Sequence, residues 1–473
     1  MRLISFDTKG WRARLDQDFT EDNVARVADA VGAYWSDQGC GKVVYIGFDT
    51  RQSASVFAHR AAQIIASWGF VAKLSDRPCP LPALSFNVAA DKDACGGLMI
   101  SASGSPSEYE GVCLRDENGC VYSQETYGQI EDLIPTQVPE QAGEVYICDF
   151  NTPYLEDIRS RVDEESIRKA NLRIVVDPMY GTARDILANL LGSLGVDVIE
   201  IHGDDVDDFC GIHPRPVEPW IDECERAAVN LKCQAGLILD GDADRLGVVD
   251  STGHFVNPHR LSALLASHLV ENRGQKGRVV APLSSSMYIR RQAWRLGCPL
   301  THTPIGFLWA SLEMHKGDCL LATDTAGGIA YPCHLHERDG IMAAVLLVEM
   351  MACEHMNMDQ LVDQLEQQVG HMDYGSKEIL LDVAQVQMIK NYLPGVNPQT
   401  LAGATPSQVS HGDGLRLQFD DGSWVMIRPS RTHGVVRVYA EAQTPARRDE
   451  LLRSASVLVR SGFKTDDPDE LDF

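Results

Sequence analysis

Apolar runs of strand length alternate with segments of helical length three times along this 473-residue chain. The runs are KVVYIGFD, NLRIVVDPMYG and RVVAPLSSS. Each precedes a segment with the spacing of an amphipathic helix, such as SASVFAHRAAQIIASWG after the first run. A helix that returns the chain to the same sheet after each strand gives parallel or mixed sheets covered by helices. The alternation therefore predicts an α/β protein.

The C-terminal part of the chain has a different pattern. GLRLQFDDGSWVMIRPS contains two strand runs around a turn, GVVRVYAEAQ adds a third, and the helical segment ARRDELLRSASVLVRSG follows. Strands followed by a helix indicate an α+β domain. The sequence thus predicts four domains: three α/β domains with mixed sheets over 1–140, 141–255 and 256–372, and an α+β domain over 373–473.

Charge and composition argue against several kinds of protein. The formal net charge of −25 disfavours a nucleic-acid-binding surface. MRLISFDTKGWRARL lacks the apolar segment of a signal peptide, and no window reaches the roughly 18 apolar residues of a membrane span. The longest apolar run, IMAAVLLVEMMA (341–352), contains Glu349 and predicts a buried helix. The thirteen cysteines form no C-x-x-C pair, so we expect reduced thiols and a cytoplasmic protein.

The strongest local signal is DGDADR, from Asp240 to Arg245. Asp240, Asp242 and Asp244 alternate with small residues between two buried-strand patterns, AGLIL and LGVVD. Uncompensated charges at the edge of a core are costly, and carboxylate oxygens suit Mg²⁺ or a similar hard cation. The pattern favours a metal site; the alternative is a solvated acidic turn.

Two further loops carry weaker signals. SASGSP (101–106) follows the strand pattern GGLMI, which favours a reactive serine, although Ser/Gly/Pro clusters are mostly ordinary turns. RPSRTHGVVR (428–437) combines arginines, hydroxyls and a glycine, as in a phosphate-binding loop. The alternative for this second loop is a polar β-loop with solvent-facing arginines.

Taken in order, these motifs resemble those of the α-D-phosphohexomutase family, the phosphoglucomutases and phosphomannomutases, over essentially the whole chain. The matching segments are FDTKGWRA with Phe6, Thr8, Gly10 and Arg12, GFDTR with Gly47, Asp49 and Arg51, SASGSP, FCGIHPRP (209–216), DGDADR, TPIGF (303–307), HLHERDGI with His334, and RPSRT with Arg428, Pro429, Ser430 and Thr432. The resemblance implies a four-domain phosphohexomutase with its active site where the domains meet.

The resemblance also implies roles for individual residues. Phospho-Ser103 would exchange its phosphoryl group with a hexose phosphate through a bisphosphate, and one Mg²⁺ would bind Ser103, Asp240, Asp242 and Asp244. Arg12 and Arg245 would assist, and His334 stands at a family histidine. The implied substrate-binding residues are Thr303, Gly306, Asp324, Thr325, Arg428, Ser430, Thr432 and Arg437. The expected partner is a small sugar phosphate, with no nucleic acid or membrane, and the protein would be a monomer or homodimer.

Departures from the family pattern cluster in these same loops. Gly104 and Ser105 replace a histidine and an asparagine, Cys113 replaces a lysine, and Asp324 and Thr325 replace two sugar-binding glutamates. Arg431 and His433 stand where glycine and glutamate are usual. Lys9, which replaces an aspartate, is expected either to carry the proton or to be a surface charge. The alternatives to a mutase are a diverged sugar-phosphate phosphotransferase or phosphatase and a non-catalytic sugar-phosphate-binding protein.

Overall fold

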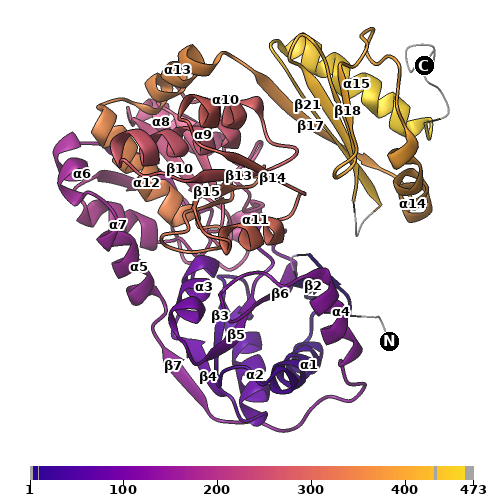
Figure 1. Cartoon of the computed structure of the whole chain (residues 1–473). Helices are drawn as coiled ribbons and strands as arrows, with labels where there is room; N and C mark the ends of the chain where they lie inside the picture. Colours follow the sequence, from indigo (N-terminus) through magenta and orange to yellow (C-terminus); the bar gives the residue numbers. More distant parts are fainter. Residues whose placement is uncertain (1–3, 9, 431–433, 464–473) are drawn as a thin grey trace. The chain divides into compact units, whose positions relative to one another are not determined.

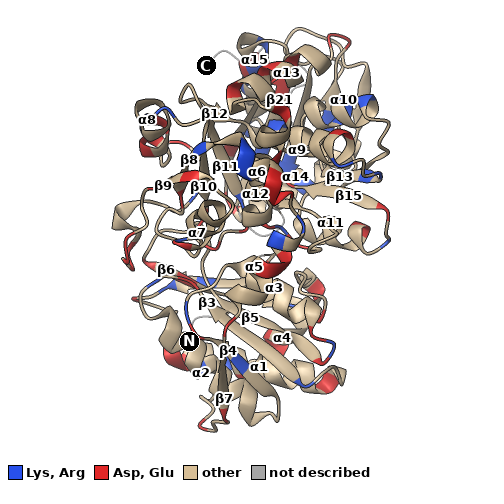
Figure 2. Ribbon diagram, turned by 90° about the vertical axis from the view of Figure 1, so that its left-hand side faces the viewer, with Lys and Arg blue, Asp and Glu red and all other residues tan. Residues whose placement is uncertain are grey.

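The computed structural model describes residues 4–8, 10–430 and 434–463 (Figure 1). The chain divides into two compact units, Met1–Val280 with Gly306–Gln364, and Ala281–Ile305 with Leu365–Phe473. Figure 2 shows Asp and Glu distributed over elements of both units, so the negative charge is not confined to one segment.

The first unit begins with a seven-stranded mixed sheet of order β1-β2-β6-β5-β3-β4-β7. Its strands are β1 (Phe6–Asp7), β2 (Gly10–Arg14), β3 (Val43–Phe48), β4 (Val71–Ser75), β5 (Ala94–Ile100), β6 (Tyr109–Arg115) and β7 (Val145–Cys148). β3, β4, β5 and β7 run parallel, whereas β6 is antiparallel to both β5 and β2. The helices of this part are α1 (Glu21–Gln38), α2 (Ala54–Ser67), α3 (Leu81–Ala90) and α4 (Gln124–Asp132).

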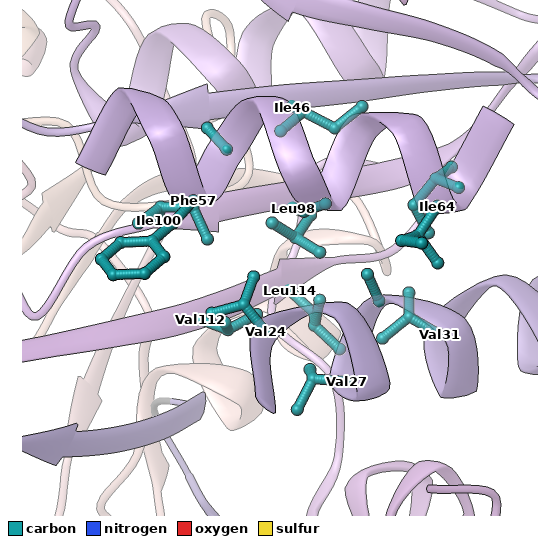
Figure 3. Close-up of a cluster of buried hydrophobic side chains, with 14 of the residues drawn as sticks. Val24, Val27, Val31, Ile46, Phe57, Ile64, Leu98, Ile100, Val112 and Leu114 are labelled. Atoms are coloured by element: carbon teal, nitrogen blue, oxygen red, sulfur yellow. The ribbon is translucent and has the colours of Figure 1, made fainter. Parts of the chain in front are cut away.

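Two apolar layers flank this sheet. Val24, Val27 and Val31 of α1 pack with α2 and with strand residues such as Leu98 and Leu114 (Figure 3). A second cluster joins α3 to other strand side chains of the sheet. Burial of this apolar surface on both sides fixes where the strands end, and so fixes the loop after β5.

A five-stranded sheet of order β12-β11-β10-β8-β9 follows in the same unit. Its strands are β8 (Arg173–Asp177), β9 (Asp197–Glu200), β10 (Ala235–Leu239), β11 (Leu246–Asp250) and β12 (Phe255–Val256). β8 is parallel to β9 and β10, and β10 turns tightly into antiparallel β11. The other elements are α5 (Asn151–Ser160), α6 (Glu164–Ala170), α7 (Ile186–Ser193), η1 (Phe209–Gly211) and α8 (Asp222–Asn230).

A four-stranded sheet has the order β14-β13-β15-β16, and its strand β13 crosses from the first unit into the second. Its strands are β13 (Arg278–Pro282), β14 (Leu300–Thr303), β15 (Cys319–Thr323) and β16 (Ile329–Ala330). The helices in this stretch are α9 (Pro258–Ser267), η2 (His268–Asn272), α10 (Met287–Arg295), α11 (Phe307–Met314), α12 (Gly340–Glu354) and α13 (Met358–Val369).

Helix α12 contains the longest apolar run of the sequence. Every residue from Gly340 to Ala352 is buried, and Glu349 lies 3.6 Å from Arg273 and 3.7 Å from His268. The prediction of a buried helix is confirmed. No single helix among the described residues is long and apolar enough to cross a membrane. By length and composition alone, only α12 and α13 taken together would pass, with an 80° bend between them.

The second unit contains an antiparallel five-stranded sheet of order β17-β21-β20-β19-β18. The strands are β17 (Asp373–Leu380), β18 (Gln408–Ser410), β19 (Leu415–Gln418), β20 (Trp424–Pro429) and β21 (Val435–Ala442), with α14 (Val383–Tyr392), η3 (Leu393–Gly395) and α15 (Pro445–Arg460). The expected α+β pattern is confirmed here, and mixed sheets with helices confirm the α/β class elsewhere.

The expectation of reduced thiols is wrong for one pair of cysteines. Cys40, just after α1, and Cys95 on β5 form a disulfide, whereas the other eleven cysteines, all within the described residues, are free. Val43 of β3 lies opposite Ala94 of β5, and this parallel pairing brings two cysteines 55 positions apart to a Cα–Cα distance of 5.1 Å. Cysteine spacing along the chain does not show such a pairing.

Candidate active site

The serine loop follows β5, at the end of the first sheet. Ser103 has a φ of +50°, a left-handed conformation that is uncommon for a residue with a side chain. Its backbone N–H donates to Ser101 Oγ at 2.9 Å. Arg51 Nη2 donates to the carbonyl oxygens of Ser103 and Ser105, at 2.6 and 2.8 Å, and Asp49 holds the guanidinium at 3.1 Å. The unusual backbone of the serine is therefore fixed by a buried ion pair.

The acidic turn lies between β10 and β11. Ala243 has a φ of +59°, and its N–H donates to the carbonyl of Asp240, so the chain turns sharply. As a result, Asp240, Asp242 and Asp244 each present a carboxylate oxygen within 4.8 Å of the others, and all three residues are at most 2% exposed.

The electrostatics of this turn suit a cation. Burial and the neighbouring carboxylates Asp244 and Asp242 raise the pKa of Asp240 well above its usual range. Burial and Asp244 also raise the pKa of Asp242. Asp242 Oδ1 is buried and accepts no hydrogen bond from the residues that the structure describes. Three buried acids with an orphaned oxygen form a donor set that fits a hard divalent ion.

The serine loop and the acidic turn lie side by side. Ser103 Oγ and Asp240 Oδ2 are 3.3 Å apart. A Cβ on Gly241 would lie 2.7 Å from the carbonyl oxygen of Ser103, so only glycine permits this approach. The HPRP segment lies against both loops, because Pro214 accepts from the N–H of Gly241 and Arg215 Nε donates to Gly104 O at 2.9 Å. Three segments distant in sequence are thus brought together.

Two predicted arginines belong to the same cluster. Arg245 lies 3.6 Å from both Asp240 and Asp244, and these carboxylates raise its pKa despite its burial. Arg12 on β2 is directly opposite Gly111 of β6, and its charge offsets a small part of the rise in the pKa of Asp242 that burial and Asp244 cause. Both cations therefore act on the acidic turn.

Arg51, Arg215 and Arg338 also belong to this site, and sequence reasoning gave them no role. Arg51 lies in a motif that had been recognised, so the signal was present. Arg338 Nη2 is 2.6 Å from Asp244 Oδ2. Arg215 and Arg338 likewise lie in the matching segments FCGIHPRP and HLHERDGI, but a stretch of sequence does not reveal which carbonyl or carboxylate an arginine will meet.

The sugar-loop candidates lie in loops and at the ends of strands. Asp324 Oδ1 accepts from the N–H groups of Ala326 and Gly328 at 2.7 and 2.8 Å, so this oxygen holds its own loop. Thr325 is half-buried beside it. Gly306 has a φ of +125° and is the N-cap residue directly before α11, and Thr303 is buried at the end of β14.

His334 is enclosed by carboxylates. Its Nδ1 lies 2.6 Å from Asp157 and its Nε2 lies 3.0 Å from Asp339, while its ring stacks on Phe86 at a centroid distance of 5.5 Å. Despite burial, the two carboxylates raise its pKa. Both nitrogens are occupied, and the structure shows no contact between His334 and Ser103.

Cys113, which replaces a family lysine, and Lys9 are the other two positions considered for proton transfer. Cys113 on β6 is buried, its Sγ lies 3.6 Å from the Ser101 carbonyl oxygen, and burial raises the pKa of its thiol to about 11. Lys9 lies outside the described residues.

The candidate phosphate loop belongs to the second unit. Arg428 on β20 is directly opposite Arg437 on β21, so both side chains share one face of the sheet. Asp413 accepts from Arg428 Nε at 2.9 Å, and Glu378 accepts from Arg437 Nε at 2.8 Å. The N–H of Ser430 donates to Val435. Arg431, Thr432 and His433 lie outside the described residues.

Sequence profiles of known families match nearly the whole chain. They are the phosphoglucomutase/phosphomannomutase alpha/beta/alpha domains I (residues 3–140), II (152–253) and III (257–369) and the C-terminal domain of the same proteins (383–455). These matches show that the chain belongs to the α-D-phosphohexomutase family. The contact between the serine loop and the acidic turn agrees with this membership.

Individual relatives match over nearly their full length. A phosphoglucomutase/phosphomannomutase of Thermococcus kodakarensis is 27% identical over 470 residues, covering 97% of this chain and 99% of that protein. A probable phosphoglucosamine mutase of Pyrococcus abyssi is 28% identical, covering 97% and 98%. The crystal structure of a putative phosphomannomutase from Thermus thermophilus superimposes with a TM-score of 0.86 at 30% identity, covering 97% and 99%.

Proposed function

We propose that this protein is a phosphohexomutase that interconverts the 1- and 6-phosphates of a hexose. The observation that carries the proposal is the 3.3 Å approach of Ser103 Oγ to Asp240 within a buried turn of three carboxylates. A protein that only binds sugar phosphates has no need to bury three acids beside a serine, because their mutual repulsion costs stability.

The proposed reaction transfers one phosphoryl group at a time. A free sugar hydroxyl attacks the phosphorus of phospho-Ser103, the bond from phosphorus to the Ser103 oxygen breaks, and the hydroxyl loses its proton. The resulting bisphosphate returns its other phosphoryl group to Ser103 by the reverse chemistry. Catalysis of such transfers rests on positioning and neutralisation of charge, for which Arg12 and Arg245 are placed.

One Mg²⁺ would be held by Asp240, Asp242 and Asp244 together with Ser103 or its phosphate. When bound, it would neutralise charge on the transferring oxygens. The orphaned oxygen of Asp242 and the raised pKa values of Asp240 and Asp242 support this assignment.

Substrate binding is assigned to the loops of the later domains, for which we propose the boundaries 256–372 and 373–473. Arg428 and Arg437, whose side chains share one face of their sheet, would grip the non-reacting phosphate with Ser430 and Thr432. Thr303, Gly306, Asp324 and Thr325 would contact the sugar. The proton would pass to Lys9, because both ring nitrogens of His334 already face carboxylates. The names of the two relatives, a phosphoglucomutase/phosphomannomutase and a probable phosphoglucosamine mutase, favour glucose, mannose or glucosamine phosphates as substrates.

A second candidate, transfer of the phosphoryl group to water, is favoured by one observation. Asp324 Oδ1 is engaged by its own loop, which leaves the sugar site one acceptor weaker than two glutamates would make it. A site that lacks partners for a hydroxyl discriminates poorly among acceptors.

The test is an assay of glucose, mannose and glucosamine 1-phosphates with a matching bisphosphate as activator. Wild-type protein should form the 6-phosphate, and Ser103→Ala should abolish the conversion. Ser105→Ala is the matched control. Arg51 holds Ser105 through its backbone carbonyl oxygen, which the substitution leaves in place, so this variant should keep most of the activity. Release of inorganic phosphate without isomerisation would replace the mutase with the phosphatase, and an active Ser103→Ala protein would contradict both.

A further inference from the structure

Arg338 is a buried cation between two loops that the sequence assigns to different tasks. It is 9% exposed. Its Nη2 lies 2.6 Å from Asp244 Oδ2 in the acidic turn, and its Nη1 lies 3.5 Å from Asp324 Oδ2 in the candidate sugar loop. The guanidinium also lies over the ring of Phe307, 5.2 Å from its centroid.

The loop from Asp324 to Gly328 is built around this arginine. Asp324 uses one carboxylate oxygen to accept from two N–H groups of its own loop and turns the other toward Arg338. A Cβ on Gly328 would lie 2.3 Å from Arg338 Cδ and 2.6 Å from Asp324 Oδ2. No side chain fits there, so the position of the arginine and the shape of the loop depend on each other.

One buried guanidinium is therefore shared by a carboxylate of the acidic turn and a carboxylate of the candidate sugar loop. Inside a protein, the attraction between such charges is much stronger than in water. When Asp324 moves away or loses its charge, Arg338 keeps Asp244 at 2.6 Å as its nearest carboxylate, with Glu337 at 3.5 Å. A guanidinium held more tightly on Asp244 competes with any divalent cation for that carboxylate.

From this arrangement we propose that Arg338 is a positioning residue that couples divalent-cation affinity at Asp240, Asp242 and Asp244 to the state of the loop from Asp324 to Gly328. The proposal rests on the proposed function, because it takes the acidic turn to be a metal site. Through Arg338, a substrate that engages the loop would alter how firmly the cation is held, and by linkage the cation would alter how firmly the loop binds substrate.

The test measures binding of Mn²⁺ alone by calorimetry or electron paramagnetic resonance, without any turnover. Asp324→Asn should weaken Mn²⁺ binding by about tenfold, within the usual range of coupling between sites. In an Arg338→Met background, the same Asp324→Asn change should alter the dissociation constant by less than about twofold. Arg338→Lys keeps the charge and should retain part of the effect.

Arg26 provides a matched control. It is also a buried arginine, and it donates to the Pro135 carbonyl oxygen at 2.6 Å and to Asn23 Oδ1 at 2.9 Å rather than to Asp244 or Asp324. In an Arg26→Met background, the full effect of Asp324→Asn should remain. An equal loss of Mn²⁺ affinity in the wild-type and Arg338→Met backgrounds would overturn the coupling alone. Failure of folded wild-type protein to bind Mn²⁺ would overturn both the coupling and the metal site of the proposed function.

If Arg338→Met does not fold, the effect of Asp324→Asn on Mn²⁺ binding is compared between the Arg338→Lys background and the wild type. The Asp324→Asn effect should then be smaller in the lysine background than in the wild type. An effect of the same size in both would contradict the proposal.

Discussion

The Nε of Arg215 donates a hydrogen bond to the carbonyl oxygen of Gly104, one residue after the candidate nucleophile, at 2.9 Å. A Cβ at position 104 would lie 2.5 Å from Arg215 Cγ and 3.1 Å from the Pro214 carbonyl oxygen. The histidine that the family usually has at this position would occupy the space that the arginine fills. Gly104 and Arg215 are therefore a matched pair, and the glycine is not simply a lost histidine.

This pairing predicts compensation between the two positions. Gly104→His should displace the arginine and lower both turnover and thermal stability. Arg215→Asn alone should lower turnover and thermal stability by less. The double variant should recover part of the loss, with a coupling energy of about 1–2 kcal/mol, as found for residues in contact. Turnover and unfolding free energies of the four proteins measure this coupling, and strictly additive effects would refute the pairing.

Cys113 is predicted not to be the proton carrier, although it stands in the position of a family lysine. With a pKa of about 11, about one thiol in 10⁴ is ionised at neutral pH. Cys113→Ser should therefore keep most of the turnover, and iodoacetamide should react with exposed Cys210 and Cys333 long before Cys113. A Cys113→Ser protein that folds but has lost its activity would make the thiol a participant.

Lys9, which replaces a family aspartate, is the proposed proton carrier. Lys9→Met should lower turnover by about 10²–10⁴-fold, the usual contribution of general acid–base catalysis, with little change in the unfolding free energy. Lys42, an ordinary lysine before β3, provides the matched control as Lys42→Met. Equal turnover of wild type and Lys9→Met would make Lys9 the surface charge that is the alternative interpretation.

The His334 cluster predicts a pH-dependent contribution to stability. Asp157 and Asp339 raise the pKa of His334 above its ordinary 6.5. His334 and Arg161 in turn lower the pKa of Asp157 to about 2, so that carboxylate stays ionised. Because the folded state binds the histidine proton more tightly, its stabilisation is complete below pH 6.5 and is lost as the pH rises through the raised pKa.

Urea unfolding of wild type and His334→Gln between about pH 5.5 and 8.5 measures this pH-dependent stabilisation by His334. The stability difference between the two proteins should shrink as the pH rises. His202, whose pKa is also raised, is present in both and cancels in the difference. A difference that is constant or grows with pH would show that His334 is not held as a cation.

Much of the fold follows from local pattern. The strand and helix spacing predicted the α/β layers, and the turn between β10 and β11 was visible because small residues separate three aspartates between apolar runs. β17 and α14 were missed, since β17 is mostly half-buried or exposed and shows little apolar alternation.

The partners of single charged side chains could not be predicted in this way. Arg215 and Arg338 meet their carbonyl and carboxylate partners only after two sheets have packed. The same holds for the two carboxylates around His334 and for the Cys40–Cys95 pair. Such contacts depend on three-dimensional approach rather than on periodicity, and in this chain they include the groups that surround the serine.

The central claim is that Ser103 carries the phosphoryl group, and intact-protein mass spectrometry tests it most directly. After incubation with a hexose 1,6-bisphosphate, wild-type protein and the Ser105→Ala control should each gain about 80 Da, one phosphoryl group. Peptide mapping should place this group on Ser103, and Ser103→Ala should show no gain. A wild-type protein that never gains this mass, or a Ser103→Ala protein that gains it equally, would contradict the account.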